Sequence, residues 1–262
     1  MPVGHYENFP VASLLLPADL RRPVEVIYHF ARSADDFADE GTDAPDIRLK
    51  KIEGYRRQLE TPIEPLLREV HKIAREHGLP LRLFGDLLDA FSQDVTKKRY
   101  ASYAEVLDYC RRSANPVGRL LLHLFGQTAE ADLRRSDAIC SALQLVNFWQ
   151  DIAIDFVRDD RVYLPQYEMA RFGVSQLHLV EKICDDAWRA LMAFQVARTR
   201  ELMLSGAPLG RSLRGRIGLE IRATIQGGLR ILEKIEAAGY DVFRNRPVLG
   251  ALDWPRLLLK AL

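Results

Sequence analysis

Residues 144–165, QLVNFWQDIAIDFVRDDRVYLP, combine a strongly apolar predicted helix with evenly spaced polar side chains. Apolar residues cover most of the circumference of this helix, which indicates that it is buried. Its polar residues recur at i, i+3, i+7 and i+11 and therefore form a stripe along one face: Gln144, Asn147, Asp151 and Asp155. Because an ionised aspartate is rarely buried without a partner, we expect a cation to face Asp151 and Asp155.

A second polar stripe runs along a helix predicted for residues 18–41. Its members fall at i, i+4, i+7 and i+11: Tyr28, Arg32, Asp35 and Asp39. The same spacing predicts that Asp36 and Glu40 point elsewhere on the helix. An apolar face lies beside this stripe, so periodicity alone does not decide whether the stripe borders a cavity or open solvent.

Helical signals recur along the chain, and hairpin turns between alternating strands are missing, so the sequence predicts an all-α fold. Helices are predicted over residues 18–41, 46–59, 63–77, 81–95, 103–126, 136–157, 176–204 and 211–238. Capping boxes are predicted at Thr61–Glu64 and Ser102–Glu105, and a glycine stop at Gly78. No repeat or low-complexity linker is found, so residues 1–262 are predicted to form a single domain.

The overall charge balance excludes nucleic acid as an expected partner. The 262 residues carry 37 basic against 36 acidic side chains, for a formal net charge of +1. Cys110, Cys140 and Cys184 lack disulfide or zinc spacing, which favours the cytoplasm. No apolar run approaches the roughly 20 residues of a membrane span. The segment DWPRLLLKAL, residues 253–262, leaves open a loose peripheral association with a membrane surface.

The chemistry of the two stripes favours a magnesium site that binds a diphosphate. Carboxylate and amide oxygens are hard ligands suited to Mg²⁺, which commonly binds through carboxylates and substrate phosphates together. Arg32 on the first stripe, and Arg161 with Tyr163 after the second, are suitable donors to phosphate oxygens. The alternative is that arginines neutralise both stripes as ordinary ion pairs.

These residues resemble the squalene and phytoene synthase family along nearly the whole chain. The resemblance is carried in order by HYENFP, IYHFARSADDFADE, YCRRSANPVG, QLVNFWQDIAIDFVRDDRVYLP and ILEKIEAAGYDVFRNRP. It implies the isoprenoid synthase fold, in which helices surround a deep apolar cavity with Mg²⁺–diphosphate bound at its mouth by two Asp-rich motifs.

The resemblance also implies roles for individual residues. The metal-binding and catalytic acids would be Asp35 and Asp39, with Asp36 beside them as a further metal ligand, and Asp151 and Asp155 with Asn147. Diphosphate contacts are implied for His5, Tyr28, Arg32, Arg161, Tyr163 and Arg246. Tyr109 and Gln144 match polar positions that line the substrate cavity.

Within the family, the opening segment and the first acidic motif resemble the HpnC type of hydroxysqualene synthase from bacterial hopanoid pathways. That resemblance implies that the substrate is presqualene diphosphate, which ionises with the help of Mg²⁺. Water then captures the cation to give hydroxysqualene, and NADPH is not needed. Gln150 stands before Asp151 where many condensing relatives have an arginine. Asn115 is interpreted as a residue that positions water or, equally, as a turn residue before Pro116.

Two other functions remain open at this level. One is a head-to-head condensing enzyme that joins two prenyl diphosphates to presqualene diphosphate, squalene or phytoene. The other is a helical scaffold without catalytic activity, which the intact acidic motifs disfavour. The sequence leaves open whether the protein docks to a partner synthase. A location at the inner membrane surface is also compatible with the sequence, because the intermediate and the product would be apolar.

Overall fold

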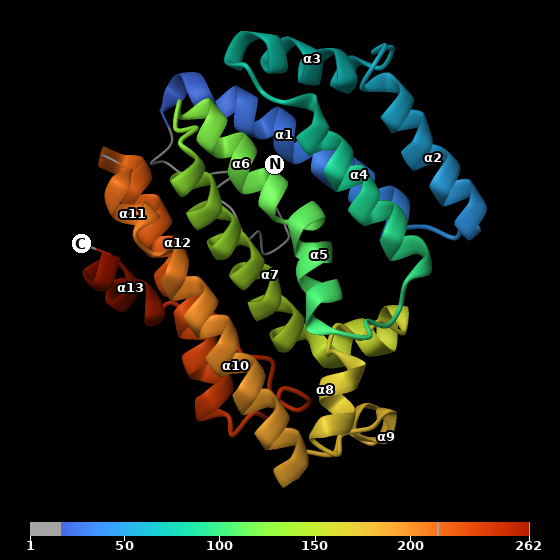
Figure 1. The fold of residues 1–262 in the computed structure, drawn as a ribbon, viewed down its shortest axis with the longest axis vertical. Helices are drawn as coiled ribbons and strands as arrows, with labels where there is room; N and C mark the ends of the chain where they lie inside the picture. Colours follow the sequence, from blue (N-terminus) through green and yellow to red (C-terminus); the bar gives the residue numbers. More distant parts are fainter. Residues whose placement is uncertain (1–16, 214, 262) are drawn as a thin grey trace. The chain divides into compact units, whose positions relative to one another are not determined.

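The computed structural model describes residues 17–213 and 215–261, and this part of the chain is built from α-helices (Figure 1). The described residues contain no β-strand, only an isolated bridge between Arg99 and Val162. The predicted all-α class is therefore confirmed. Contacts divide the chain into two compact units.

The first unit takes in the described residues up to Lys97 and residues 109–137. It contains α1 (Ala18–Asp39), α2 (Pro45–Gln58), α3 (Pro65–His77), α4 (Leu81–Thr96), α6 (Asn115–Leu124) and parts of α5 (Tyr103–Ser113) and α7 (Glu130–Asp159). Helix α1 packs against α2, α3, α4 and α6. The ring of Phe30 on α1 meets Phe84 edge-on at 5.0 Å and lies 5.8 Å from Tyr55. This packing fixes the apolar face of α1 and so the direction of its polar stripe.

The second unit consists of residues 98–108 and the described residues from Ala138 onward. Besides the rest of α5 and α7, it contains α8 (Gln166–Arg171), α9 (Gln176–Val180), α10 (Asp186–Gly206), α11 (Leu209–Ser212), α12 (Gly215–Ala237) and α13 (Asp253–Ala261). Trp149 on α7 is fully buried and donates to Thr199 Oγ1 on α10 at 2.8 Å. The predicted burial is thus confirmed for the middle of α7, while Ile154 and Val157 nearer its end are exposed.

A glycine allows three helices of this unit to approach one another closely. A Cβ atom at Gly228 on α12 would lie 2.7 Å from Cε of Met203 on α10 and 3.1 Å from Cδ2 of Leu143 on α7. Both distances are shorter than an ordinary carbon contact. The absence of a side chain at Gly228 therefore lets α12 pack directly against α7 and α10. The second polar stripe thus lies on a tightly packed helix, α7.

Most predicted helix positions are confirmed to within a few residues, but α7 starts six residues before the predicted residue 136, and two long predictions are wrong. The helix predicted over 103–126 is broken at Ala114, because Pro116 lacks an N–H group and its ring clashes with the preceding turn. The helix predicted over 176–204 stops at Val180. There Lys182 has a left-handed φ of 53°, and Asp185 starts α10 by accepting from Trp188 N at 2.9 Å.

The predicted helix caps have mixed outcomes. Ser102 Oγ accepts from Glu105 N at 3.3 Å, which confirms the serine half of that capping box, while Glu105 Oε2 accepts from Ala101 N at 2.9 Å. Gly78 ends α3 with a φ of 64°, so the glycine stop is confirmed. The capping box at Thr61 is wrong, since α3 begins at Pro65. Gln58 takes that role instead, because its Oε1 accepts from Glu64 N at 2.8 Å. No helix within the described ranges is long and apolar enough to cross a membrane.

Candidate functional site

The first acidic motif lies on the last turns of α1 around a single guanidinium group. Arg32 Nη1 lies 3.1 Å from Asp35 Oδ2, and its Nη2 lies 2.6 Å from Asp36 Oδ1 and 2.5 Å from Glu40 Oε1. The prediction that Asp36 and Glu40 point away from Arg32 is therefore wrong. Asp36 and Glu40 follow Arg32 by four and eight residues, so helical spacing itself brings their side chains to the face that carries Arg32.

The end of α1 is held in place by a second arginine. Arg48 on α2 donates to the carbonyl oxygens of Ala38 and Gly41, the latter at 2.8 Å. These contacts satisfy carbonyl groups that a helix end leaves without intrahelical partners. A cation at this end also offsets the negative end of the helix dipole. Arg48 thus supports a helix terminus that carries Asp35, Asp36 and Asp39 in its last turns.

The second acidic motif lies on α7 and contains a carboxyl group with a perturbed pKa. Gln144 and Asn147 are half-buried on the turns before Asp151. Burial raises the pKa of Asp155 from 3.8 to about 7, and repulsion from Asp151 adds to the effect, while Arg158 and Arg161 oppose it. Two close carboxylates with limited solvent access disfavour simultaneous ionisation. This part of α7 therefore favours the approach of further positive charge.

Arg246 supplies a cation to the second motif from a distant part of the chain. Its Nε donates to Asp151 Oδ1, and its Nη2 donates to Asp151 Oδ2 at 3.0 Å, in a two-point ion pair. The neighbouring Gln150 is buried and donates through Nε2 to the carbonyl of Pro247, which fastens the segment that carries Arg246. The expectation that a cation faces Asp151 is confirmed.

The loop after α7 folds back onto the helix. The backbone N–H of Arg161 donates to the Asp155 carbonyl at 3.1 Å, and Arg161 Nη1 lies 3.5 Å from Tyr163 Oη. The Tyr163 ring stacks on Phe148 of α7, with ring centres 3.5 Å apart. Arg161 and Tyr163 are both buried, at 4% and 7% exposure. Backbone pairing and stacking thus position two polar side chains near the end of the stripe.

Tyr109, predicted to line the substrate cavity, is paired with a residue that sequence reasoning missed. Its hydroxyl donates to Asp94 Oδ2 at 2.7 Å, and both side chains are buried within the first unit. The signal was present on α4, where Asp94 follows Leu87 and Phe91 on the apolar face at i+7 and i+3. A carboxylate on a buried helix face requires a partner, and Tyr109 provides one.

The fit of these residues to Mg²⁺ rests on the chemistry of their donors. Among the residues that the structure describes, no group of three His, Cys, Asp or Glu side chains is gathered as a metal site. Arginines bind carboxylates of both stripes here, so the ion-paired alternative describes the observed contacts and metal binding stays a prediction. The oxygen donors suit Mg²⁺, and the raised pKa of Asp155 shows that its carboxylate would gain from a nearby cation. His5 lies outside the described residues.

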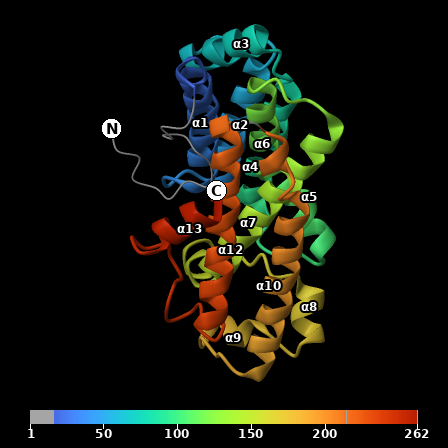
Figure 2. The same ribbon diagram turned by 90° about the vertical axis from the view of Figure 1, so that its left-hand side faces the viewer.

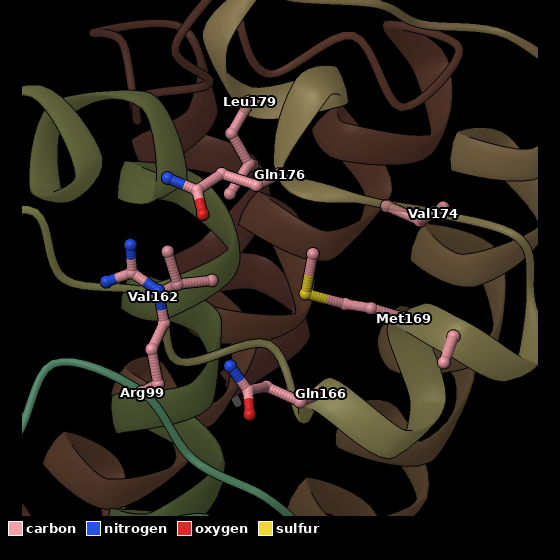
Figure 3. A pocket seen from close by; sticks show the side chains of 8 residues that line it. Arg99, Val162, Gln166, Met169, Val174, Gln176 and Leu179 are labelled. Carbon is pink, nitrogen blue, oxygen red and sulfur yellow. The ribbon is translucent and has the colours of Figure 1, made fainter.

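A pocket of about 170 Å³ in the second unit lies beside the loop but contains none of the predicted site residues (Figure 3). It is lined by Arg99, Val162, Gln166, Met169, Ala170, Val174, Gln176 and Leu179. Arg99 also donates to Asp160 Oδ1 at 2.5 Å. Pockets for organic ligands usually measure roughly 300–1,000 Å³, so this one is too small for a long isoprenoid chain.

Comparison with known proteins identifies relatives along most of the chain. The hydroxysqualene synthase of Sinorhizobium fredii is 41% identical over 171 residues, which cover 64% of this chain and 58% of that protein. The hydroxysqualene synthase of Rhodopseudomonas palustris is 36% identical over 219 residues, which cover 82% of this chain and 74% of that protein. The matched region is thus just over half of the first relative and about three quarters of the second.

A solved structure and a family profile extend this similarity. The crystal structure of squalene synthase HpnC from Alicyclobacillus acidocaldarius is 33% identical, covers 90% of each chain and superposes with a TM-score of 0.83. The profile of the squalene/phytoene synthase family matches residues 3–253. The helical fold is therefore of the isoprenoid synthase type, and the chain belongs to the squalene/phytoene synthase family.

Proposed function

We propose that the protein is a hydroxysqualene synthase that acts on presqualene diphosphate. In this reaction the carbon–oxygen bond to diphosphate breaks, a water oxygen bonds to the carbocation, and the water loses one proton. The observation that carries the proposal is the polar end of α7, where Asp151 and Asp155 lie with Arg246 and Arg161. Identities of 33–41% to hydroxysqualene synthases support this choice within the family.

Mg²⁺ is the proposed cofactor, and NADPH is not required by the reaction. The residues that would hold the metal are Asp35, Asp36, Asp39, Asn147, Asp151 and Asp155. Bound Mg²⁺ would act as a Lewis acid that neutralises charge growing on the departing diphosphate. The carboxylates supply the hard oxygen ligands for this purpose, and the Asn147 amide adds a neutral one.

The donors around the acidic motifs have a separate task in the proposed reaction. Arg32, Arg161 and Arg246 are permanently charged and match the geometry of phosphate oxygens through paired N–H groups. The hydroxyls of Tyr28 and Tyr163 add neutral donors. Because the stacking of Tyr163 on Phe148 and its burial hold that hydroxyl in place, little reorganisation is needed as the charge develops.

The side chain before Asp151 supports hydroxysqualene synthesis over condensation. Condensation of two prenyl diphosphates requires binding of a second anionic substrate, which a further cation would favour. At this position Gln150 is neutral, buried and committed to the carbonyl of Pro247. A buried amide that already donates to the backbone is poorly suited to recruit a second diphosphate.

The proposal is tested by separate incubation of the purified protein with presqualene diphosphate and with farnesyl diphosphate, each with Mg²⁺ and with or without NADPH. We expect hydroxysqualene from presqualene diphosphate and no turnover of farnesyl diphosphate alone. Consumption of farnesyl diphosphate alone would identify a condensing enzyme instead. Squalene formed only when NADPH is present would also reject the proposal.

A further inference from the structure

The outer side of α13 and the loop before it carry an exposed apolar patch. Leu252, Trp254 and Leu259 are 94%, 54% and 75% exposed. Leu259 lies on α13, and Leu252 lies in the turn just before its first residue, with the exposed Pro255 between them. Single exposed apolar residues are common, but a group of large ones on so short a segment marks an interaction surface.

Ion pairs hold α13 with this patch facing outward. Asp253 is buried and accepts from Lys234 Nζ at 2.5 Å and Arg230 Nε at 2.7 Å, both on α12, and from Gly250 N at 2.8 Å. Leu257 and Ala261 follow Asp253 at four and eight residues and are buried on the same side. Figure 2 shows α13 beside α12, within the same unit. The helix thus has a charged anchor on its inner side, and Leu259, six residues after Asp253, is exposed on its outer side.

Basic residues border the patch and exceed the nearby acids. Arg256 and Lys260 have side chains that are 52% and 43% exposed, and they lie 3.6 and 3.4 Å from carboxylate oxygens of Glu233. Arg230 also pairs with Glu233, so one carboxylate is shared by three cations. Residues 205–262 contain ten Lys and Arg against five Asp and Glu, although the whole chain has a net charge of only +1. Positive charge is therefore concentrated in this segment.

We propose that α13 and its preceding loop form a peripheral docking surface for an anionic lipid bilayer. Leucines beside a tryptophan, with basic residues along the margin, are the chemistry of a helix that lies in the membrane interface. The aliphatic stems of Arg256 and Lys260 can remain near the apolar patch while their charged groups meet lipid phosphates. This surface goes beyond the proposed reaction and does not depend on it.

Binding is tested by flotation of the full chain with vesicles of phosphatidylglycerol and phosphatidylethanolamine, and with phosphatidylcholine vesicles for comparison. We expect binding to the anionic vesicles that weakens with added salt. Of the three tryptophans, Trp149 and Trp188 are fully buried, so a blue shift of tryptophan emission on binding reports Trp254. A Trp254→Phe variant should lose that shift.

Matched variants distinguish binding by this surface from nonspecific binding by exposed apolar side chains elsewhere on the protein. The double variant Leu252→Gln/Leu259→Gln should weaken binding to anionic vesicles by at least about tenfold. Its control is Ile63→Gln/Leu177→Gln, which removes exposed apolar side chains from the loop before α3 and from α9, 67% and 57% exposed. This control should change binding by less than about twofold. Circular dichroism checks that all variants remain folded.

Three outcomes would overturn the proposal. One is no binding of the folded wild-type chain to anionic vesicles at low salt, and another is equal loss of binding in the two double variants. The third is a wild-type dimer in sedimentation that Leu252→Gln/Leu259→Gln dissociates without any vesicle binding, which would assign the patch to a second copy of the chain. None of these readouts requires turnover, so failure here is distinguishable from failure of the proposed reaction.

Discussion

Arg246 and Asp151 are 95 residues apart in sequence, and their side chains meet in a two-point ion pair. Such a pair fixes the orientation of both groups. Each is also proposed to contact the magnesium–diphosphate group, Asp151 as a metal ligand and Arg246 as a donor to phosphate oxygens. The ion pair therefore holds two functional groups of opposite charge next to each other.

Replacement of Asp151 should abolish turnover without unfolding the chain. We expect Asp151→Ala to lower kcat/KM for presqualene diphosphate by at least about a hundredfold, because a proposed metal ligand is lost. The partly exposed site should tolerate the loss of one carboxylate, so the circular dichroism spectrum should stay unchanged. Steady-state kinetics at saturating Mg²⁺ measures the effect.

The matched control for this variant lies on the same helix. Glu130 is exposed, near the start of α7, and pairs only weakly with Arg134 at 3.2 Å. Glu130→Ala should retain wild-type turnover. A fully active Asp151→Ala protein would contradict the metal assignment, as would a comparable loss in Glu130→Ala.

The raised pKa of Asp155 predicts how stability depends on pH in metal-free buffer. Because the folded-state pKa is about 7 against 3.8 for the ordinary group, the folded protein binds the extra proton between these values. The stability from this group is complete below about pH 3.8 and is lost as the pH rises through about 7. The shift corresponds to at most about 4 kcal/mol.

Asp155→Asn removes this titration and provides the test. Chemical unfolding from about pH 5 to about pH 8 should show that the wild type loses stability relative to the variant as the pH rises. Parallel stability curves for the two proteins would contradict the assignment of this pKa to Asp155.

At the level of single residues, the sequence predicts which side chains belong to the candidate site better than it predicts the partners that they bind. The spacing along α7 identified Asp151 and Asp155, because helical periodicity alone places them on one face. It did not predict that Arg246 binds Asp151, since the fold of the intervening chain determines that contact. The prediction also misplaced Asp36 and Glu40, although Asp36 follows Arg32 by four residues, a spacing that brings side chains together on a helix. Asp94 was missed although its buried position on α4 was readable.

At the level of helices, the ends marked by strong local signals were predicted correctly, and the breaks inside long predicted helices were not. The glycine stop at Gly78 and the Ser102 cap are local hydrogen-bond signals, and both were confirmed. The break at Ala114 depended on whether Pro116 would kink or end the helix, which tertiary packing decides. The short α13 was read only as an apolar and basic segment, because its helix is stabilised by Asp253 binding to α12.

A close helix contact gives a stability prediction for α12. A Cβ atom at Gly218 would lie 2.1 Å from the backbone oxygen of Leu213 and 2.9 Å from that of Gly210. Backbone atoms cannot move aside as a flexible side chain does. Gly218→Ala should therefore lower the free energy of unfolding by about 1–3 kcal/mol, measured by urea denaturation.

Gly227 on the same helix is the control for this substitution. A Cβ atom there would make an ordinary contact of 3.6 Å with Leu249. Since alanine favours the helix over glycine, Gly227→Ala should be neutral or stabilise the protein by up to about 1 kcal/mol. Equal destabilisation by both substitutions would contradict the packing explanation.

At the level of the whole molecule, the order of the sequence motifs predicted the family, and the profile match over residues 3–253 confirmed it. Composition and helical periodicity alone reach only the all-α class, since many unrelated chains share them. The specific reaction depends on the groups that surround the carbocation, and their arrangement is set by the complete fold. The predicted single domain and cytoplasmic location remain predictions.

In the proposed reaction, this protein adds water to a cation formed from presqualene diphosphate. Incubation with presqualene diphosphate and Mg²⁺ in water enriched in heavy oxygen, followed by mass spectrometry of the isolated product, tests this step. We predict hydroxysqualene whose hydroxyl carries the heavy isotope, with diphosphate released in equal amount. An alcohol without the isotope, or a hydrocarbon product alone, would contradict the account.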